Sequence, residues 1–190
     1  MKVVAFNGSA RKHGNTTRLI ETVFEELNAA GIDTELIEMA GTHPYGCSAC
    51  NQCRTRKDGC CANSKDQVNA WIAKMKDADG IILASPTYYA DVTSEMKALI
   101  DRAGYVAGAN DAMFKRKVGA AVIAVRRGGE IHAFDTINHF FTISQMIIPG
   151  SSYWNFGFGR DKGDVEHDDE GLRTMRTLGQ NMAWLLQKLG

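Results

Sequence analysis

The hydrophobic residues of this chain fall into short unbroken runs that alternate with longer segments of helical periodicity. The apolar runs predict strands at 2–6, 80–85, 118–125 and 146–148, and residues 34–39 are predicted to form the second strand. Apolar residues that recur every three to four positions predict helices over 16–30, 66–77, 92–103, 130–145 and about 168–189. Strands that are apolar without alternation are buried on both faces, which is typical of a parallel sheet covered by helices on both sides.

This order of elements predicts an α/β fold built on a doubly wound, five-stranded parallel sheet with strand order 2-1-3-4-5. No repeat or linker interrupts the pattern, so we expect residues 1–190 to form a single domain. A long loop at about 41–65 is predicted to be an insertion with a function of its own. Ligands of such sheets bind at the carboxyl ends of the strands, so function is expected in the loops that follow them.

Composition excludes several classes of protein. Lys plus Arg and Asp plus Glu each total 22, which gives a net charge of zero. We therefore expect no nucleic-acid partner and no membrane partner. No apolar run approaches the roughly 18–20 residues of a transmembrane helix, and the apolar start of the chain is too short for a secretory signal. The expected location is cytoplasmic.

The loop at 7–17, between the first predicted strand and helix, has the composition of a phosphate site. It contains two glycines, three hydroxyl side chains, two asparagines, two basic side chains and no acid. Hydroxyls and free amides at a helix N-terminus bind phosphate oxygens, and the helix dipole favours the negative charge. Walker and dinucleotide fingerprints are both absent, so a terminal monophosphate such as that of FMN is predicted. An ordinary polar loop is the alternative. The candidate ligands are Ser9, Arg11, Asn15, Thr16 and Thr17.

Two segments resemble a known family. Residues 8–16, GSARKHGNT, resemble the phosphate loop of the NADPH-dependent FMN reductase family, with Ala10 where that family often has proline. Residues 78–89, ADGIILASPTYY, together with 96–102, MKALIDR, resemble the third strand, flavin loop and following helix of the family. The resemblance runs in order from residue 3 to about 129. It implies a flavodoxin-like fold with bound FMN.

The resemblance also implies that Pro86, Thr87, Tyr88 and Tyr89 contact the flavin ring. A rigid turn with free amides and aromatic rings suits a flavin, although the tyrosines could serve only in packing. Arg126 and Gly128 follow the fourth predicted strand. Glycine lets a backbone approach a planar ligand, and arginine could hold a nicotinamide nucleotide phosphate or balance the charge of the flavin. A solvated surface arginine is the alternative.

All five cysteines lie within the predicted insertion. Successive C-x2-C-x2-C spacing lets thiolates converge and is typical of [4Fe–4S] ligation. The loop resembles that of the iron–sulfur flavoproteins, a branch of the same family. If a cluster is present, its ligands would be Cys47, Cys50, Cys53 and Cys60, with Cys61 as the alternative to Cys60. Redox-active or structural thiols are the other interpretation, and the sequence leaves the choice open.

Together these features predict an FMN-dependent oxidoreductase. It would take hydride from NADPH or NADH and pass electrons to a small-molecule or protein acceptor, such as a flavin or a quinone. No catalytic acid or base is predicted, because the cofactor carries the chemistry. One alternative is an electron carrier with FMN and a [4Fe–4S] cluster, reduced by a ferredoxin-like partner; another is a flavin-free regulatory module. The resemblance and the aromatic and Met-rich segments 88–96 and 141–156 predict a homodimer or homotetramer.

Overall fold

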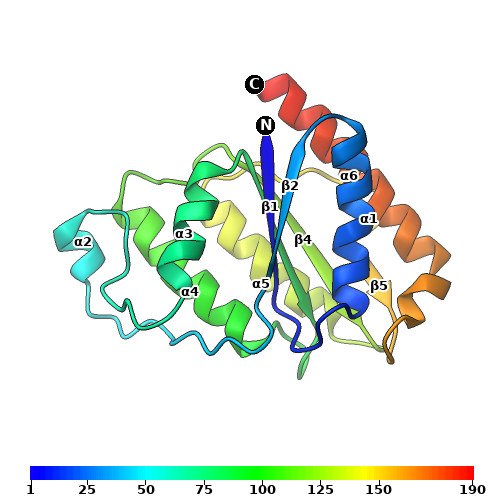
Figure 1. The fold of residues 1–190 in the computed structure, drawn as a ribbon, viewed down its shortest axis with the longest axis horizontal. Helices are drawn as coiled ribbons and strands as arrows, with labels where there is room; N and C mark the ends of the chain where they lie inside the picture. The colour runs from blue at the N-terminus through cyan, green and yellow to red at the C-terminus, as the bar shows by residue number, and fades with distance from the viewer.

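The computed structural model describes all 190 residues and places five parallel strands in one sheet, in the order β2-β1-β3-β4-β5 (Figure 1). This confirms the predicted doubly wound sheet. The strands are β1 Lys2–Asn7, β2 Asp33–Glu38, β3 Gly80–Pro86, β4 Val118–Val125 and β5 Phe156–Phe158. All of them end at the lower edge of Figure 1, so the loops that follow them meet there.

Helices cover both faces of the sheet (Figure 1). On one face lie α1 Asn15–Ala29 and α6 Asp169–Leu189, and on the other lie α3 Val68–Asp77, α4 Ser94–Ala109 and α5 Glu130–Ile143. Two short helices were not predicted: α2 Gln52–Arg56 lies within the cysteine-containing insertion, and a 3₁₀-helix spans Asp164–His167. No helix is both long enough and apolar enough to span a bilayer.

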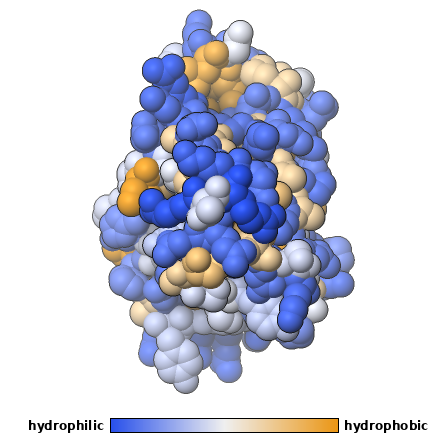
Figure 2. All heavy atoms as spheres, turned by 90° about the vertical axis from the view of Figure 1, so that its left-hand side faces the viewer, coloured by the Kyte–Doolittle hydropathy of each residue, from blue (hydrophilic) through white to orange (hydrophobic).

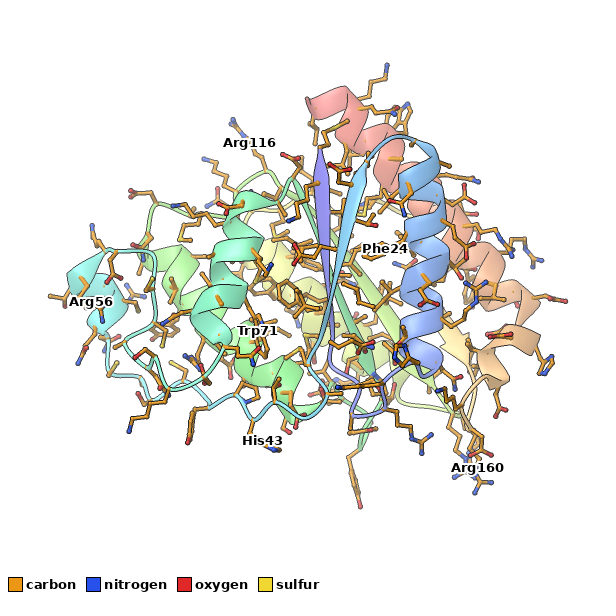
Figure 3. The ribbon with its side chains drawn as sticks, viewed as in Figure 1. Phe24, His43, Arg56, Trp71, Arg116 and Arg160 are labelled. Atoms are coloured by element: carbon orange, nitrogen blue, oxygen red, sulfur yellow. The ribbon has the colours of Figure 1, made fainter.

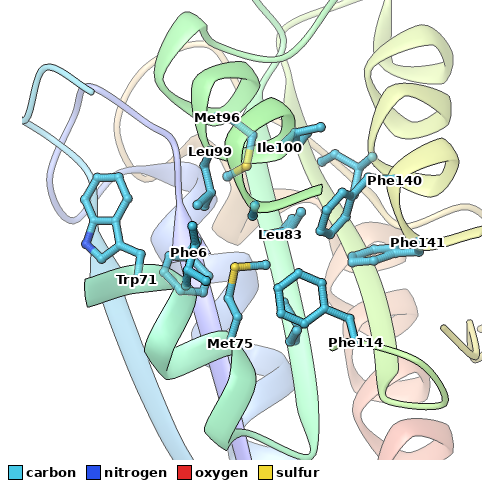
Figure 4. Packing of buried hydrophobic residues seen from close by; sticks show 14 of the residues in the cluster. Phe6, Trp71, Met75, Leu83, Met96, Leu99, Ile100, Phe114, Phe140 and Phe141 are labelled. Atoms are coloured by element: carbon cyan, nitrogen blue, oxygen red, sulfur yellow. The ribbon is translucent and has the colours of Figure 1, made fainter. Parts of the chain in front are cut away.

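The sheet separates two hydrophobic clusters because successive side chains of a strand point to opposite faces. In β1, Val4 and Phe6 belong to the cluster beneath α3, α4 and α5, whereas Val3 and Ala5 face α1 and α6. Figure 4 shows the first of these clusters, in which Phe6 meets the edge of the Trp71 ring at a centroid distance of 6.3 Å. Burial on both faces is the reason that the central strands β1, β3 and β4 are nearly continuous apolar runs.

The fifth strand was predicted at 146–148, and this position is wrong. In the structure β5 is Phe156–Phe158, paired with Ile123–Val125, while Ile147 makes only an isolated bridge to Val118. Pro149 has no N–H group to continue a ladder, so the chain leaves the sheet there. It returns at Asn155, whose side-chain amide donates to the Ala121 carbonyl at 2.9 Å. As a consequence, the segment after Phe158 arrives at the same sheet edge as the loop after β1.

Candidate functional site

A cavity of about 350 Å³ opens at this edge, between the loops that follow β1, β3, β4 and β5. Its volume lies within the range of roughly 300–1,000 Å³ that is usual for small-molecule sites. Most of the candidate FMN-binding residues line it. The lining consists of Ser9, Arg11, Gly14, Asn15, Thr16, Pro86, Thr87, Tyr88, Ala124, Arg126, Gly159, Arg160, Asp161 and Lys162.

The N-terminus of α1 supplies free hydrogen-bond donors to this cavity. The N-cap residue is Gly14, which has no side chain to cap the helix, and the first turn contains no acid. The backbone N–H groups of Asn15, Thr16 and Thr17 donate to no protein atom. Unpaired N–H groups at the positive end of a helix dipole form an anion site. The start of α1 can therefore receive a phosphate.

The loop before α1 is fixed by β3 and α4. The Gly8 N–H donates to the Ala84 carbonyl at 2.8 Å, and the Gly8 carbonyl accepts from the Thr93 hydroxyl at 2.9 Å. A Cβ atom at position 8 would lie 2.8 Å from Thr93 Oγ1, so only glycine fits. The Ser9 hydroxyl accepts from the Arg11 N–H at 3.1 Å and thereby shapes the turn. The loop is thus pre-formed in the structure.

Two candidate phosphate ligands have other partners. Asn15 lines the cavity, but its side-chain amide donates to the Asp161 carbonyl and accepts from the Gly163 N–H, both at 2.9 Å. Thr17 lies outside the cavity, and its hydroxyl donates to Glu38 at 3.1 Å. Asn15 therefore holds the segment after β5 against α1, and Thr17 holds α1 against the end of β2.

The segment Gly159–Lys162 was missed by the sequence analysis. It adds Arg160 and Lys162 to the wall, and Arg11 donates to the Arg160 carbonyl at 3.1 Å. Figure 3 shows Arg160 at the lower edge of the molecule, beside the start of α1. Recognising 156–158 as the last strand would have placed this segment at the ligand-binding edge.

The walls of the cavity are electropositive. They contain four basic side chains and one acidic side chain, in a chain whose net charge is zero. The carboxylate of the neighbouring Asp164 accepts hydrogen bonds from the backbone N–H groups of Asp161 and Arg160. These bonds lower the pKa of Asp164, and the bond from Asp161 is the largest cause. The excess of positive charge favours an anionic ligand.

The loop after β3 ends in a strained turn. Tyr88 and Asp91 exchange backbone hydrogen bonds, and Tyr89 and Ala90 between them have φ values of 48° and 65°. Such a turn usually carries Asn-Gly, and non-glycine residues pay a conformational cost there. The Thr87 hydroxyl, which is buried at the cavity wall, has no hydrogen-bond partner. Unpaired buried polar atoms and backbone strain are both features of ligand sites. Tyr89 is fully exposed and lines no wall.

In the loop after β4, Arg126 lines the cavity, whereas the predicted Gly128 is exposed and does not. The packing of this loop instead requires glycine at the next position, Gly129. Its φ is 91°, and a Cβ atom there would lie 2.7 Å from Ala90 Cα. Gly129 therefore allows the loop after β4 to pack against the strained turn.

Four of the five cysteines line one small hollow of about 20 Å³, namely Cys47, Cys50, Cys53 and Cys61. Cys60 does not line it. The thiols are gathered but not arranged as ligands, since no three metal-binding side chains stand in a common coordination geometry. Hydrogen bonds from the Gln52 backbone and the Ser48 side chain lower the pKa of Cys50, and a lower pKa favours the thiolate form that binds metals. The cysteine loop contains α2, which packs against α4 (Figure 1), and the surface on that side is mainly hydrophilic (Figure 2).

We expect Asn15→Ala to weaken binding at the cavity through the segment after β5. The substitution removes the hydrogen bonds to the Asp161 carbonyl, which is exposed, and from the Gly163 N–H, which is partly buried, and each bond contributes about 0.5–1.5 kcal/mol. Limited proteolysis within 159–163 should become faster, and isothermal titration should show weaker FMN binding. Asn28→Ala, at the far end of α1, is the control. Unchanged proteolysis with weakened binding would instead make Asn15 a direct ligand.

Comparisons with known proteins show the family and the fold. The family model described as NADPH-dependent FMN reductase matches residues 1–161. An iron–sulfur flavoprotein of Methanocaldococcus jannaschii is 38% identical over 195 residues, which cover 96% of each chain. An iron–sulfur flavoprotein of Methanosarcina thermophila is 31% identical over 98% of this chain and 96% of its own. Among solved structures, a WrbA-like flavodoxin of Agrobacterium tumefaciens superimposes with a TM-score of 0.64 at 17% identity, over 98% of this chain and 97% of that one, which shows a shared fold.

Proposed function

Since the chain belongs to the NADPH-dependent FMN reductase family, we propose that its 350 Å³ cavity binds FMN and that the protein transfers electrons between FMN, a [4Fe–4S] cluster in the cysteine loop and an external partner. The observation that carries the proposal is the unpartnered N-terminus of α1 inside an electropositive cavity. When bound, FMN supplies the redox chemistry, because it exchanges electrons singly or in pairs.

The residues present fit FMN. The N–H groups at the start of α1 and the guanidinium of Arg11 would bind the terminal phosphate. The unpaired Thr87 hydroxyl would hydrogen-bond the flavin, and Tyr88 would form a wall beside the ring. Arg126 would offset negative charge on the cofactor. The absence of a dinucleotide fingerprint favours FMN over FAD.

The thiols of the cysteine loop fit a cluster by their chemistry and their common location. Cys47, Cys50 and Cys53 line one hollow together with a fourth cysteine, which is the donor set of a [4Fe–4S] centre. The relatives named iron–sulfur flavoproteins support the same assignment. When bound, the cluster would supply one-electron transfer. The chain contributes the thiolates and the packing that excludes water from Cys53, which is 8% exposed.

The test is the composition of protein purified without oxygen. We expect FMN released by acid to be stoichiometric with the chain, FAD to be absent, and iron and sulfide each to be about four per chain. A protein that takes up no FMN on titration would instead be the flavin-free module. A protein with FMN, no iron and five free thiols would contradict the cluster but leave the flavin assignment intact.

The electron donor is a separate question. Hydride donation by NADPH or NADH is favoured by Arg126 at the cavity wall and the exposed Arg127 beside it, which suit a nucleotide phosphate. Anaerobic mixing with NADPH, NADH or a reduced ferredoxin distinguishes the two donor classes. Flavin bleaching by a nicotinamide nucleotide alone identifies the reductase, and bleaching only by ferredoxin identifies the carrier.

We expect the protein to form a homodimer or homotetramer. Several large apolar side chains are exposed on the single chain, including Ile143, which is 84% exposed, and Tyr89, Tyr153 and Trp154. Burying such a surface stabilises association. Light scattering at micromolar concentration should give at least twice the 20.8 kDa chain mass, and Ile143→Glu should lower the measured mass. A monomer with FMN bound would contradict the expectation.

A further inference from the structure

The side chain of Arg102 on α4 is buried beneath the cysteine loop. It is 1% exposed and is the largest fully buried side chain of the molecule. Its partners all come from the insertion between β2 and α3: an ion pair with Asp66, and hydrogen bonds to the carbonyls of Tyr45 at 3.1 Å and Asn63 at 2.7 Å. A buried guanidinium is costly unless its charge and donors are satisfied. Arg102 thus ties the loop to α4.

A further donor of Arg102 is directed at a thiol. Arg102 Nε donates to Cys61 Sγ at 3.3 Å. The backbone of Cys61 is held as well: its N–H donates to Asn69 Oδ1 at 2.8 Å and its carbonyl accepts from Asn69 Nδ2 at 2.9 Å. Cys61 Sγ is therefore fixed at the hollow that Cys47, Cys50 and Cys53 also line.

The adjacent Cys60 has none of these contacts. Its N–H donates to Asp58, and its side chain neither lines the hollow nor meets Arg102. Spacing alone allows either Cys60 or Cys61 to be the fourth cysteine after the C-x2-C-x2-C run, so the sequence does not distinguish them. The position of Cys61 in the structure does distinguish them.

We propose that Cys61, and not Cys60, is the fourth thiolate ligand, and that Arg102 is the positioning residue that orients it and sets the reduction potential of the cluster. This rests on the proposed presence of a cluster. An N–H donor on a ligating sulfur stabilises the form that carries one more electron, so it raises the reduction potential. The positive charge of the guanidinium acts in the same direction.

The ligand assignment is tested with Cys60→Ser and Cys61→Ser as a matched pair, purified without oxygen beside the wild type. We expect Cys60→Ser to keep wild-type iron and FMN, and Cys61→Ser to lose most of its iron while keeping FMN, which binds at a separate cavity. Iron lost from Cys60→Ser and kept in Cys61→Ser would overturn the assignment and leave the cluster itself intact. A wild type without iron would overturn the cluster and this inference together.

The role of Arg102 is tested with Arg102→Lys, which keeps a positive charge but cannot reproduce the fork of donors. We expect the ratio of reduced to oxidised cluster, measured at a fixed ambient potential, to fall about tenfold. For a one-electron couple this corresponds to a reduction potential lower by about 59 mV. Iron and FMN should be retained. A potential equal to that of the wild type would overturn the positioning role.

Since Arg102→Lys could also unfold the loop, a measurement on the wild type accompanies it. After labelling with ¹⁵N-arginine, the reduced cluster should show a ¹⁵N hyperfine coupling in its paramagnetic resonance spectrum. The same coupling should persist in Arg54→Lys, which removes the arginine that follows Cys53 and whose guanidinium lies over the Tyr105 ring. Absence of the coupling in the wild type would overturn the contact between Arg102 and the cluster ligand.

Discussion

Replacing Arg11 and Thr16 together by alanine is expected to weaken FMN binding by about 10²- to 10⁴-fold. Both side chains line the cavity at the start of α1, where the phosphate would lie. Charge-assisted hydrogen bonds are worth about 1.5–3 kcal/mol each, and about 1.4 kcal/mol is a factor of ten in affinity. Quenching of FMN fluorescence on titration into the apoprotein measures the change directly.

The matched control is Arg18→Ala with Thr22→Ala, which removes the same two residue types at positions on α1 outside the cavity. Arg18 pairs with Glu25 at 2.8 Å, and the Thr22 hydroxyl donates to the Arg18 carbonyl at 3.0 Å. FMN affinity should not change in this control. Riboflavin, which lacks the phosphate, should bind wild type and the Arg11/Thr16 variant equally. FMN affinity that survives the Arg11/Thr16 change would refute the phosphate site.

Asp66→Asn is expected to destabilise the protein by about 3–5 kcal/mol, because it leaves a buried guanidinium without its counter-charge. The side chains of Arg102 and Asp66 are 0% and 8% exposed. For a chain of this size the loss corresponds to a fall of about 6–20 °C in Tm. Calorimetry on the FMN-bound protein provides the measurement. The control is Asp101→Asn, which breaks the surface ion pair with Lys97 and should cost less than about 1 kcal/mol.

The same ion pair predicts a dependence on pH. Burial by itself would raise the pKa of Asp66, but hydrogen bonds from Arg102 and from the N–H groups of Tyr45 and Val68 lower it. The stabilisation by the carboxylate is therefore present above its unfolded pKa of about 3.9 and is lost as the pH falls through the lower folded pKa. The difference in Tm between wild type and Asp66→Asn should shrink below about pH 4. A constant difference down to pH 2 would show that charge is not its cause.

The sequence predicted those parts of the structure that depend on local patterns. The first four strands were found within one or two residues. The central strands β1, β3 and β4 are buried on both faces and are nearly unbroken apolar runs, whereas the edge strand β2 is only partly buried. The short β5 was missed because it has only three residues, Phe156–Phe158. It pairs with the last three residues of β4, after the chain has left the sheet near Pro149. The cavity residues that follow β5, Gly159–Lys162, were not predicted from the sequence for the same reason.

Long-range contacts account for the remaining differences. Asn15 and Thr17 have the polarity of phosphate ligands, but their partners lie 146 and 21 residues away. The local sequence around Arg102 does not show that its side chain is buried, because the groups that cover it belong to the folded insertion. The choice between Cys60 and Cys61 likewise depends on a partner 41 residues from Cys61.

Helix α4 sets the distance between the cavity and the cysteine loop. Its N-cap, Thr93, holds the Gly8 carbonyl of the loop beside the cavity, and Arg102 on the same helix holds the cysteine loop. The two anchor points are separated by nine residues of helix, or about 14 Å along its axis. The loops can therefore vary in length without altering this spacing, whereas a residue added to or deleted from α4 between the anchors would change both the distance and the direction from one site to the other.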